Sequence, residues 1–246
     1  MFMCASAGNF GQAMAYACRS RKKKLLVYAA TTASPYKIER MKSLGAEVVL
    51  YGNDFDEAKE EAKRVAKESS SRMVEDALAI ETVEGAGTIG LELLTSGPFD
   101  ALLIALGNGA MFNGIATVFK ARSPKTKMIA VQAAGAPAMA ESWKSNSLVT
   151  YPAISTIADG IGVRLPIPEA LADMRPITDD VITVKEATIV KAMRLLHVHS
   201  GVVAEPSAVV GIAALMEDRE RFAGRKVATI ICGGNLTESQ IKQWLL

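Results

Sequence analysis

Apolar runs of a few residues alternate along this chain with longer segments whose apolar positions recur at helical spacing. Such short runs predict buried strands, and the segments between them predict helices. The predicted strands are residues 2–5, 25–29, 47–50, 101–106, 128–132 and 227–231; the predicted helices are 9–19, 36–44, 54–69, 81–94, 110–120, 136–144, 185–198, 207–216 and 237–246. Alternation of this kind predicts an α/β fold of parallel sheets flanked by helices.

The pattern changes at two places. Residues 1–80 form one alternating series, a predicted small α/β domain, and residues 81–246 form a predicted large α/β domain. Within the second domain, residues 145–180 are rich in proline and glycine and show no periodicity; we call them the excursion. Long segments of this kind run over the surface and are often functional.

Turns of small residues follow three of the predicted strands, and each leads into a predicted helix. They are Ser6-Ala7-Gly8-Asn9, Gly107-Asn108-Gly109 and Cys232-Gly233-Gly234-Asn235. Glycines let the backbone approach a phosphate, and the N–H groups at a helix start attract anions. One such turn alone would be an ordinary tight turn. In parallel α/β folds, however, these turns gather at the carboxyl edge of the sheet, so three of them predict a ligand site there.

The same turns carry a resemblance to a known family. Residues 6–12 resemble the substrate and cofactor loop of the threonine and serine dehydratases, which belong to the tryptophan synthase β-like, fold type II pyridoxal phosphate enzymes. Residues 107–114 resemble the phosphate loop of that family, and residues 232–235 its closing Ser-Gly-Gly-Asn turn. Further markers match in order at residues 36–48, 85–92, 135–139, 156–160 and 205–206. The resemblance covers nearly the whole chain and implies a two-domain fold with mainly parallel sheets, truncated at its N-terminus.

This resemblance implies a cofactor, pyridoxal 5'-phosphate, and a substrate, a small hydroxy amino acid (serine or threonine). The residues implied for the cofactor are Asn9 at the 3-hydroxyl, the loop Gly107, Asn108, Gly109, Ala110 and Met111, then Glu205, and Cys232 near the pyridine nitrogen. Those implied for the substrate are Ser6, Ala7, Gly8, Asn9 and Phe10. On local grounds alone, Asn9 is equally a helix cap and Glu205 equally an exposed turn carboxylate.

Five positions depart from the family pattern. Asn108 and Ala110 add side chains where the family has glycine, although asparagine tolerates left-handed backbone angles better than most residues. Cys232 replaces a serine, and a thiol is the weaker hydrogen-bond partner. Ala7 offers no titratable group where racemases of the family carry a hydroxyl, so elimination is favoured over racemisation. Gln132 replaces a carboxylate that binds metal in some relatives, so no metal site is predicted.

A catalytic lysine is expected to be missing. In the family, the lysine that forms the Schiff base lies about one helix upstream of the loop at residue 6, and only five residues precede Ser6. The lysines Lys22, Lys23 and Lys24 follow a helix predicted to begin at Asn9. At ~1.5 Å per residue they lie ~20 Å from the loop, beyond reach of the cofactor.

Composition excludes several other classes of protein. The 28 basic and 26 acidic residues nearly balance, so no nucleic-acid partner is predicted, and the basic run at residues 19–24 is interpreted as a solvated helix end. No apolar run approaches the ~20 residues that span a bilayer, and no signal peptide is evident. Three cysteines without metal-ligand spacing fit a reducing compartment, so we expect a cytoplasmic protein.

The main hypothesis is the truncated body of a pyridoxal phosphate-dependent lyase that converts a hydroxy amino acid to a 2-oxo acid and ammonia. Without its lysine, this chain is expected to be inactive or impaired. The alternative is a non-catalytic pseudoenzyme that keeps the fold and the ligand site; a β-replacement synthase is a weaker third reading. Absence of an N-terminal segment would expose apolar surface and a sheet edge, so a homo-oligomer is expected.

Overall fold

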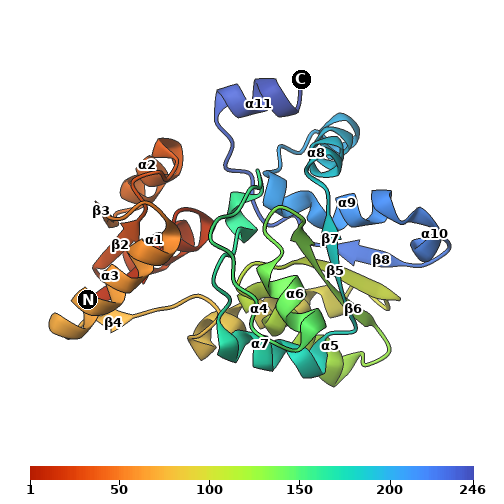
Figure 1. Cartoon of the computed structure of the whole chain (residues 1–246), viewed down its shortest axis with the longest axis horizontal. Helices are drawn as coiled ribbons and strands as arrows, with labels where there is room; N and C mark the ends of the chain where they lie inside the picture. Colours follow the sequence, from red (N-terminus) through yellow and green to blue (C-terminus); the bar gives the residue numbers. More distant parts are fainter. The chain divides into compact units, whose positions relative to one another are not determined.

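The computed structural model describes all 246 residues as two compact units, Met1–Asp76 (unit 1) and Ala77–Leu246 (unit 2). Each unit contains one four-stranded sheet in which every neighbouring pair of strands is parallel (Figure 1). The predicted α/β fold with two parallel sheets is therefore confirmed.

Unit 1 has the strand order β3-β2-β1-β4. Its elements in chain order are β1 (Phe2–Ala5), α1 (Asn9–Ser20), β2 (Leu25–Ala29), α2 (Pro35–Ser43), β3 (Glu47–Leu50), α3 (Phe55–Glu68) and β4 (Arg72–Met73). Alternate strand residues face opposite sides. Cys4 and Val27 pack with α1 and α2, whereas Met3 and Tyr28 pack with α3. Gly45, with φ +94°, follows the end of α2.

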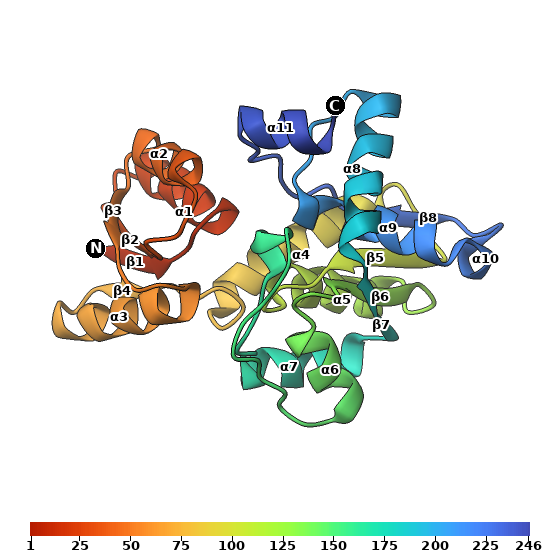
Figure 2. The same cartoon turned by 45° about the horizontal axis from the view of Figure 1, so that its top comes forward.

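Unit 2 has the strand order β7-β6-β5-β8. Its elements are α4 (Ile80–Leu94), β5 (Ala101–Ala105), α5 (Ala110–Arg122), β6 (Lys127–Ala133), α6 (Ala138–Ser145), η1 (Asp159–Ile161), α7 (Pro168–Met174), η2 (Arg175–Ile177), β7 (Asp180–Val184), α8 (Glu186–Ser200), η3 (Pro206–Val209), α9 (Val210–Glu217), α10 (Arg219–Phe222), β8 (Val227–Thr229) and α11 (Glu238–Trp244). Leu103 and Val131 face α8 and α9, and Leu102 and Ala130 face α5, α6 and α7 (Figure 2).

Glycines in α4 allow close packing against α5. A Cβ on Gly90 would lie 3.3 Å from Ile115 Cα, and a Cβ on Gly114 would lie 2.7 Å from Gly87 N. The backbones of α4 and α5 therefore approach each other where neither helix has a side chain.

Six elements were not predicted: β4, η1, α7, η2, α10 and β7. Strand β7 is the most important miss, because it pairs with β6 along its whole length, from Ile129 opposite Asp180 to Ala133 opposite Val184. Only Lys185 separates β7 from α8, so the apolar run of the strand merges in the sequence with the apolar positions of the helix. The start of β7 is also difficult to recognise in the sequence, because the strand directly follows the aperiodic excursion.

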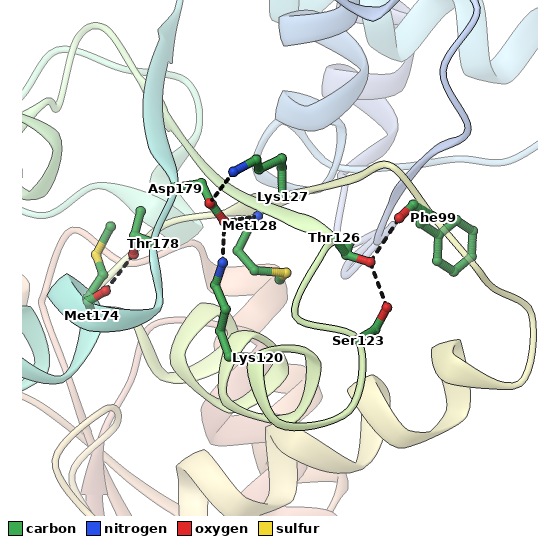
Figure 3. Close-up of polar contacts among 9 residues, drawn as sticks. All are labelled: Phe99, Lys120, Ser123, Thr126, Lys127, Met128, Met174, Thr178 and Asp179. Carbon is green, nitrogen blue, oxygen red and sulfur yellow. Dashed lines mark hydrogen bonds and ion pairs between the residues drawn. The ribbon is translucent and has the colours of Figure 1, made fainter.

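The carboxylate of Asp179 lies at the amino ends of the strands of this sheet. The turns after β5 and β8 leave the opposite edge. Asp179 accepts hydrogen bonds from Lys120 Nζ (2.5 Å), Lys127 Nζ (3.0 Å) and Met128 N (2.8 Å) (Figure 3). Burial alone would raise the pKa of Asp179, but these three donors outweigh it and lower the pKa below its ordinary value. Asp179 thus joins α5, β6 and the start of β7.

Candidate functional site

Two of the three predicted turns leave the same edge of the unit 2 sheet. Strands β5 and β8 are parallel neighbours, with Leu103 opposite Thr229. Gly107 to Gly109 follows β5 and Cys232 to Asn235 follows β8, so both turns begin at the carboxyl ends of adjacent strands (Figures 1 and 2). This is where a doubly wound sheet places a ligand.

The glycine loop ends in a backbone conformation that only glycine adopts readily. Gly109 has φ +106°, and its carbonyl accepts the backbone N–H of Asn113 (2.7 Å) in the first turn of α5. Asn108 is not among the residues with positive φ, so the left-handed tolerance anticipated for it is not used. The loop therefore presents the N-terminus of a 13-residue helix, which favours an anion.

The two side chains added to this loop have different surroundings. The methyl group of Ala110 packs with the buried cluster of Ala77, Ile167 and Ala170, so it belongs to the core. Asn108 keeps its Oδ1 buried without a hydrogen-bond donor. Buried polar atoms are normally satisfied, so this oxygen is a position where a bound water or ligand would contribute a partner.

Glu205 holds the turn after β8. It is buried, its backbone N–H donates to Gly233 O (3.0 Å), and its Oε2 accepts from Asn235 N (3.2 Å). The interpretation of Glu205 as an exposed turn carboxylate is therefore wrong. The carboxylate is part of the carboxyl edge of the sheet.

Cys232 is kept as a neutral thiol. Burial raises the pKa of Cys232, the negative charge of Glu205 raises it further, and the result is about 11. At neutral pH the side chain therefore retains its proton and can act as a weak hydrogen-bond donor.

The excursion reaches this edge at Gly160. A Cβ on Gly107 would lie 3.6 Å from Gly160 O, and a Cβ on Gly160 would lie 2.9 Å from Ser207 Oγ and 3.9 Å from Glu205 Oε1. Ser207 is buried and its hydroxyl has no partner. Sequence reasoning missed Ser207; its position directly after the marker pair Glu205-Pro206 was the available signal.

The third turn lies in unit 1, after β1. Ser6 is buried, and its Oγ accepts from the N–H groups of Gly8 (3.1 Å) and Gly11 (2.9 Å). A hydroxyl has two lone pairs and one proton, so the proton of Ser6 remains for a bound acceptor. Helix α1 begins at Asn9 itself and Gly8 takes the cap position, so the interpretation of Asn9 as the helix cap is wrong.

A buried lysine beside this turn was also missed. Lys37 on α2 is only 6% exposed, and a Cβ on Gly8 would lie 3.7 Å from its Cδ and 3.9 Å from its Nζ. One helical turn later, Met41 packs against Gly11. Lys37 is distant in sequence from the turn; the small residues Gly8, before α1, and Gly11, within it, were the sign that another element packs there. The turn in unit 1 therefore combines a hydroxyl proton, a helix N-terminus and a cation.

Gln132 lies elsewhere in unit 2, fully buried on β6. Its Oε1 accepts the N–H of Ala140 (3.0 Å) at the start of α6. The amide oxygen is thus engaged in holding α6 on the sheet.

The fold and these turns define an α/β protein with glycine-containing turns at the carboxyl ends of parallel strands. The sequence profile described as "Pyridoxal-phosphate dependent enzyme" matches residues 1–233, and the chain belongs to this family. The resemblance inferred from the sequence is confirmed.

Individual proteins and solved structures are also similar to this chain in sequence and fold. The chain is 31% identical over 238 residues to the L-threonine dehydratase biosynthetic IlvA of Halalkalibacterium halodurans, covering 95% of this chain and 57% of the relative. The structure of the processed form of threonine deaminase isoform 2 from Solanum lycopersicum matches with a TM-score of 0.91 and 28% identity, over 98% of this chain and 71% of that one. Maize serine racemase matches with a TM-score of 0.91 and 27% identity, over 98% and 75%. The chain thus spans under two thirds of the curated relative's length.

Residues of this structure fit the cofactor in its phosphate and ring positions. The left-handed Gly109 at the start of α5 suits a phosphate, and the neutral thiol of Cys232 suits a ring nitrogen that is not strongly engaged.

No helix of the chain has the length and apolar character needed to span a bilayer.

Proposed function

We propose that this chain forms the body of a pyridoxal phosphate-dependent lyase that acts on serine or threonine. The observation that supports this most directly is the convergence of the glycine loop, buried Glu205 and the Cys232 turn at one sheet edge in unit 2. When bound, the cofactor supplies an electron sink for the bonds at the substrate Cα. In the overall reaction, the substrate loses its Cα proton and its β-hydroxyl as water, and the resulting enamine hydrolyses to a 2-oxo acid and ammonia.

The residues of the chain have distinct proposed roles. The N–H groups at the start of α5, presented by Gly107 to Gly109, would bind the phosphate, and the thiol of Cys232 would donate weakly to the ring nitrogen. In unit 1, the hydroxyl of Ser6 and the ammonium of Lys37 would attract the carboxylate of the substrate, and Asn9 would contact the 3-hydroxyl of the cofactor. All of these groups would bind and orient, and the proposal assigns none of them the removal of the Cα proton.

None of the groups assigned above is a base for the Cα proton, and this sets the activity expected of residues 1–246. The lysine that the resemblance requires is not among the lysines near Ser6, so residues 1–246 alone are proposed to be inactive or very slow. A peptide or fragment that carries the lysine is the component that would restore turnover.

The test is titration of the purified chain with pyridoxal 5'-phosphate, followed by absorption spectra before and after borohydride reduction, with intact mass. We expect saturable binding without a stoichiometric covalent adduct. Gly109→Ala should weaken binding at least about tenfold, because alanine is strained at φ +106°. Gly201→Ala is the matched control: its φ is +70°, it ends α8, and no atom would contact its Cβ. Equal binding by both variants would contradict the assignment of the phosphate loop.

A pseudoenzyme is the second candidate, favoured by one observation. The buried, unpartnered Oδ1 of Asn108 places an acceptor rather than a donor in the glycine loop. Binding of the cofactor with no product after addition of a lysine-bearing fragment would favour this candidate.

A further inference from the structure

The first turn of α5 contains a polar side chain that the proposed chemistry does not use. Asn113 is 2% exposed, and its backbone N–H closes the turn onto Gly109 O. A Cβ on Gly109 would lie 3.4 Å from Asn113 Nδ2 and 3.7 Å from its Oδ1. The amide therefore lies directly against the left-handed residue of the glycine loop.

This amide connects the loop with a distant part of the chain. Asn113 Nδ2 donates to the carbonyl of Ala170 (2.9 Å), 57 residues away on α7 in the excursion. Ala170 is fully buried and packs with Ile167 against Ala110, the first residue of α5. Helix α7 thus contacts the C-terminal end of the glycine loop by a hydrogen bond and by apolar packing.

The N-terminal end of the loop contacts the excursion as well. A Cβ on Gly107 would lie 3.6 Å from both Gly160 O and Ile161 Cα. The two glycines of the loop are therefore each supported by the excursion, Gly107 by η1 and Gly109 through Asn113 by α7.

An asparagine at position 113 would be unfavourable if its only role were to pack in the core. Its Oδ1 is buried without a donor, which is unfavourable in a protein interior. An apolar residue of similar size would avoid that cost but would lose the side-chain hydrogen bond to Ala170 O. Asparagine is favoured here because its side chain donates a directed hydrogen bond to α7. That bond fixes the orientation of the first turn of α5 against the glycine loop.

We propose that Asn113 is a positioning residue for phosphate binding: the excursion, acting through the Asn113–Ala170 hydrogen bond, holds the glycine loop in its anion-binding conformation. This rests on the proposed function, since the phosphate is that of pyridoxal 5'-phosphate. It also gives the unpredicted helix α7 a role in ligand affinity. The bond makes no contact with substrate and acts only through the shape of the loop.

The experiment compares the affinities for pyridoxal 5'-phosphate and for pyridoxal, which lacks the phosphate. In Asn113→Ala we expect the affinity for pyridoxal 5'-phosphate to fall roughly tenfold and that for pyridoxal to change less than about twofold. Asn113→Leu, which keeps the branched shape of the side chain without its polar atoms, should behave in the same way if Asn113→Ala folds poorly. Equal losses for the two ligands, or no loss, would overturn the proposal.

Ser142→Ala is the matched control. Ser142 is fully buried, donates to Ala138 O and accepts from Val149 N, so it also ties the excursion to a helix but away from the loop. We expect neither affinity to change in this variant. A phosphate-specific loss in Ser142→Ala equal to that in Asn113→Ala would mean that general loosening of unit 2 is the cause.

A second readout separates this proposal from the proposed function. Amide hydrogen exchange of residues 105–115 in the ligand-free protein should accelerate in Asn113→Ala and stay unchanged in Ser142→Ala. If wild type binds no pyridoxal 5'-phosphate, the proposed function fails, while faster exchange in Asn113→Ala alone still supports the control of loop shape by Asn113. Unchanged exchange in Asn113→Ala would overturn that control whatever the ligand result.

Discussion

Cys232 shows how strongly neighbours set the chemistry of one residue. Burial is the largest cause of its raised pKa, and the charge of Glu205 adds to it. Glu205→Gln removes the charge but keeps an acceptor for Asn235 N, so the pKa of Cys232 should fall while staying above its ordinary value. Since the thiolate is the reactive form, alkylation by iodoacetamide at pH 9–10 should become faster.

The check is intact-mass measurement of alkylation rate against pH for wild type and Glu205→Gln. Cys4 serves as an internal control, because burial raises its pKa to about 12 and Glu205 is not among the causes. Identical rate profiles for Cys232 in the two proteins would show that Glu205 does not influence the thiol.

Lys37 gives a second prediction for a single residue. If its ammonium attracts the substrate carboxylate at the turn after β1, Lys37→Met should weaken binding of L-serine several-fold more than binding of L-serinamide, which has no carboxylate. Amide chemical shifts of residues 6–10 during titration provide the measurement.

Lys59→Met is the control, because Lys59 is a similarly buried lysine of unit 1 that pairs with Asp56 (3.3 Å) away from this turn. Both ligands should bind this variant as they bind wild type. A Lys37→Met variant that loses both ligands equally would reveal a packing role only.

Sequence reasoning found the residues of the turns but not their supports. Gly107, Gly109 and Cys232 were identified because they follow apolar strands directly. Lys37 and Asn113 lie inside helices, where nothing in the local pattern distinguishes a side chain that faces a loop from one that faces solvent or core. Burial and orientation of such residues depend on contacts with elements that are distant in sequence.

Among the secondary-structure elements, α4 and α5 pack backbone against backbone. A Cβ on Gly114 would lie 2.7 Å from Gly87 N and also against Val83 O, so Gly114→Ala must separate the two helices. We expect this change to lower the free energy of unfolding of unit 2 by about 2–4 kcal/mol. Urea unfolding followed by tryptophan fluorescence reports on this unit, since both tryptophans, Trp143 and Trp244, belong to it.

Gly85→Ala is the control on the same helix. No atom lies within 4 Å of a Cβ at Gly85, so alanine should stabilise unit 2 by about 0.5–1 kcal/mol through helix propensity. Opposite signs for the two glycines would establish backbone contact as the cause; equal effects would contradict it.

Asp179 ties three elements together and should do so in a pH-dependent way. Its pKa is lowered in the folded state, so its stabilisation is present above the unfolded pKa and is lost as pH falls through the folded pKa. Asp179→Asn should therefore cost about 1–2 kcal/mol between pH 5 and 8, and the difference should shrink below about pH 4.

Urea midpoints measured across this pH range provide the test for Asp179. Asp173→Asn, at an exposed position on α7, should change stability little at any pH. A constant difference between wild type and Asp179→Asn down to pH 3 would rule out the ionised carboxylate as the source.

For the molecule as a whole, the alternation of strands and helices was sufficient to predict the fold class and six of the eight strands. The strands that were missed show where the pattern fails. β4 has two residues, too few for any periodicity, and β7 merges with α8 across one lysine. Strand order cannot be read from such patterns, because it depends on which strands pair. The sequence therefore did not show that β5 and β8 are neighbours, which is the fact that brings the glycine loop and the Cys232 turn to one edge.

Strand β8 also bears on the assembly of the whole molecule. It pairs only with β5, over three residues, and forms one outer edge of the unit 2 sheet. Just beyond it, Ile231 is 37% exposed, and Val202 and Val203, also exposed, lie on the segment that contacts Gly234. An open strand edge beside exposed apolar side chains favours association with another chain.

We therefore expect the purified chain to self-associate, with a mass by light scattering that rises with concentration. Ile231→Lys places a charge beside the open edge and should shift the protein toward monomer, because burying an unpaired ammonium in an interface is unfavourable. Leu91→Lys, at an exposed position on α4, should leave the mass unchanged. A wild-type chain that stays monomeric at every concentration would show that the short edge of β8 and its apolar neighbours are too small to drive association.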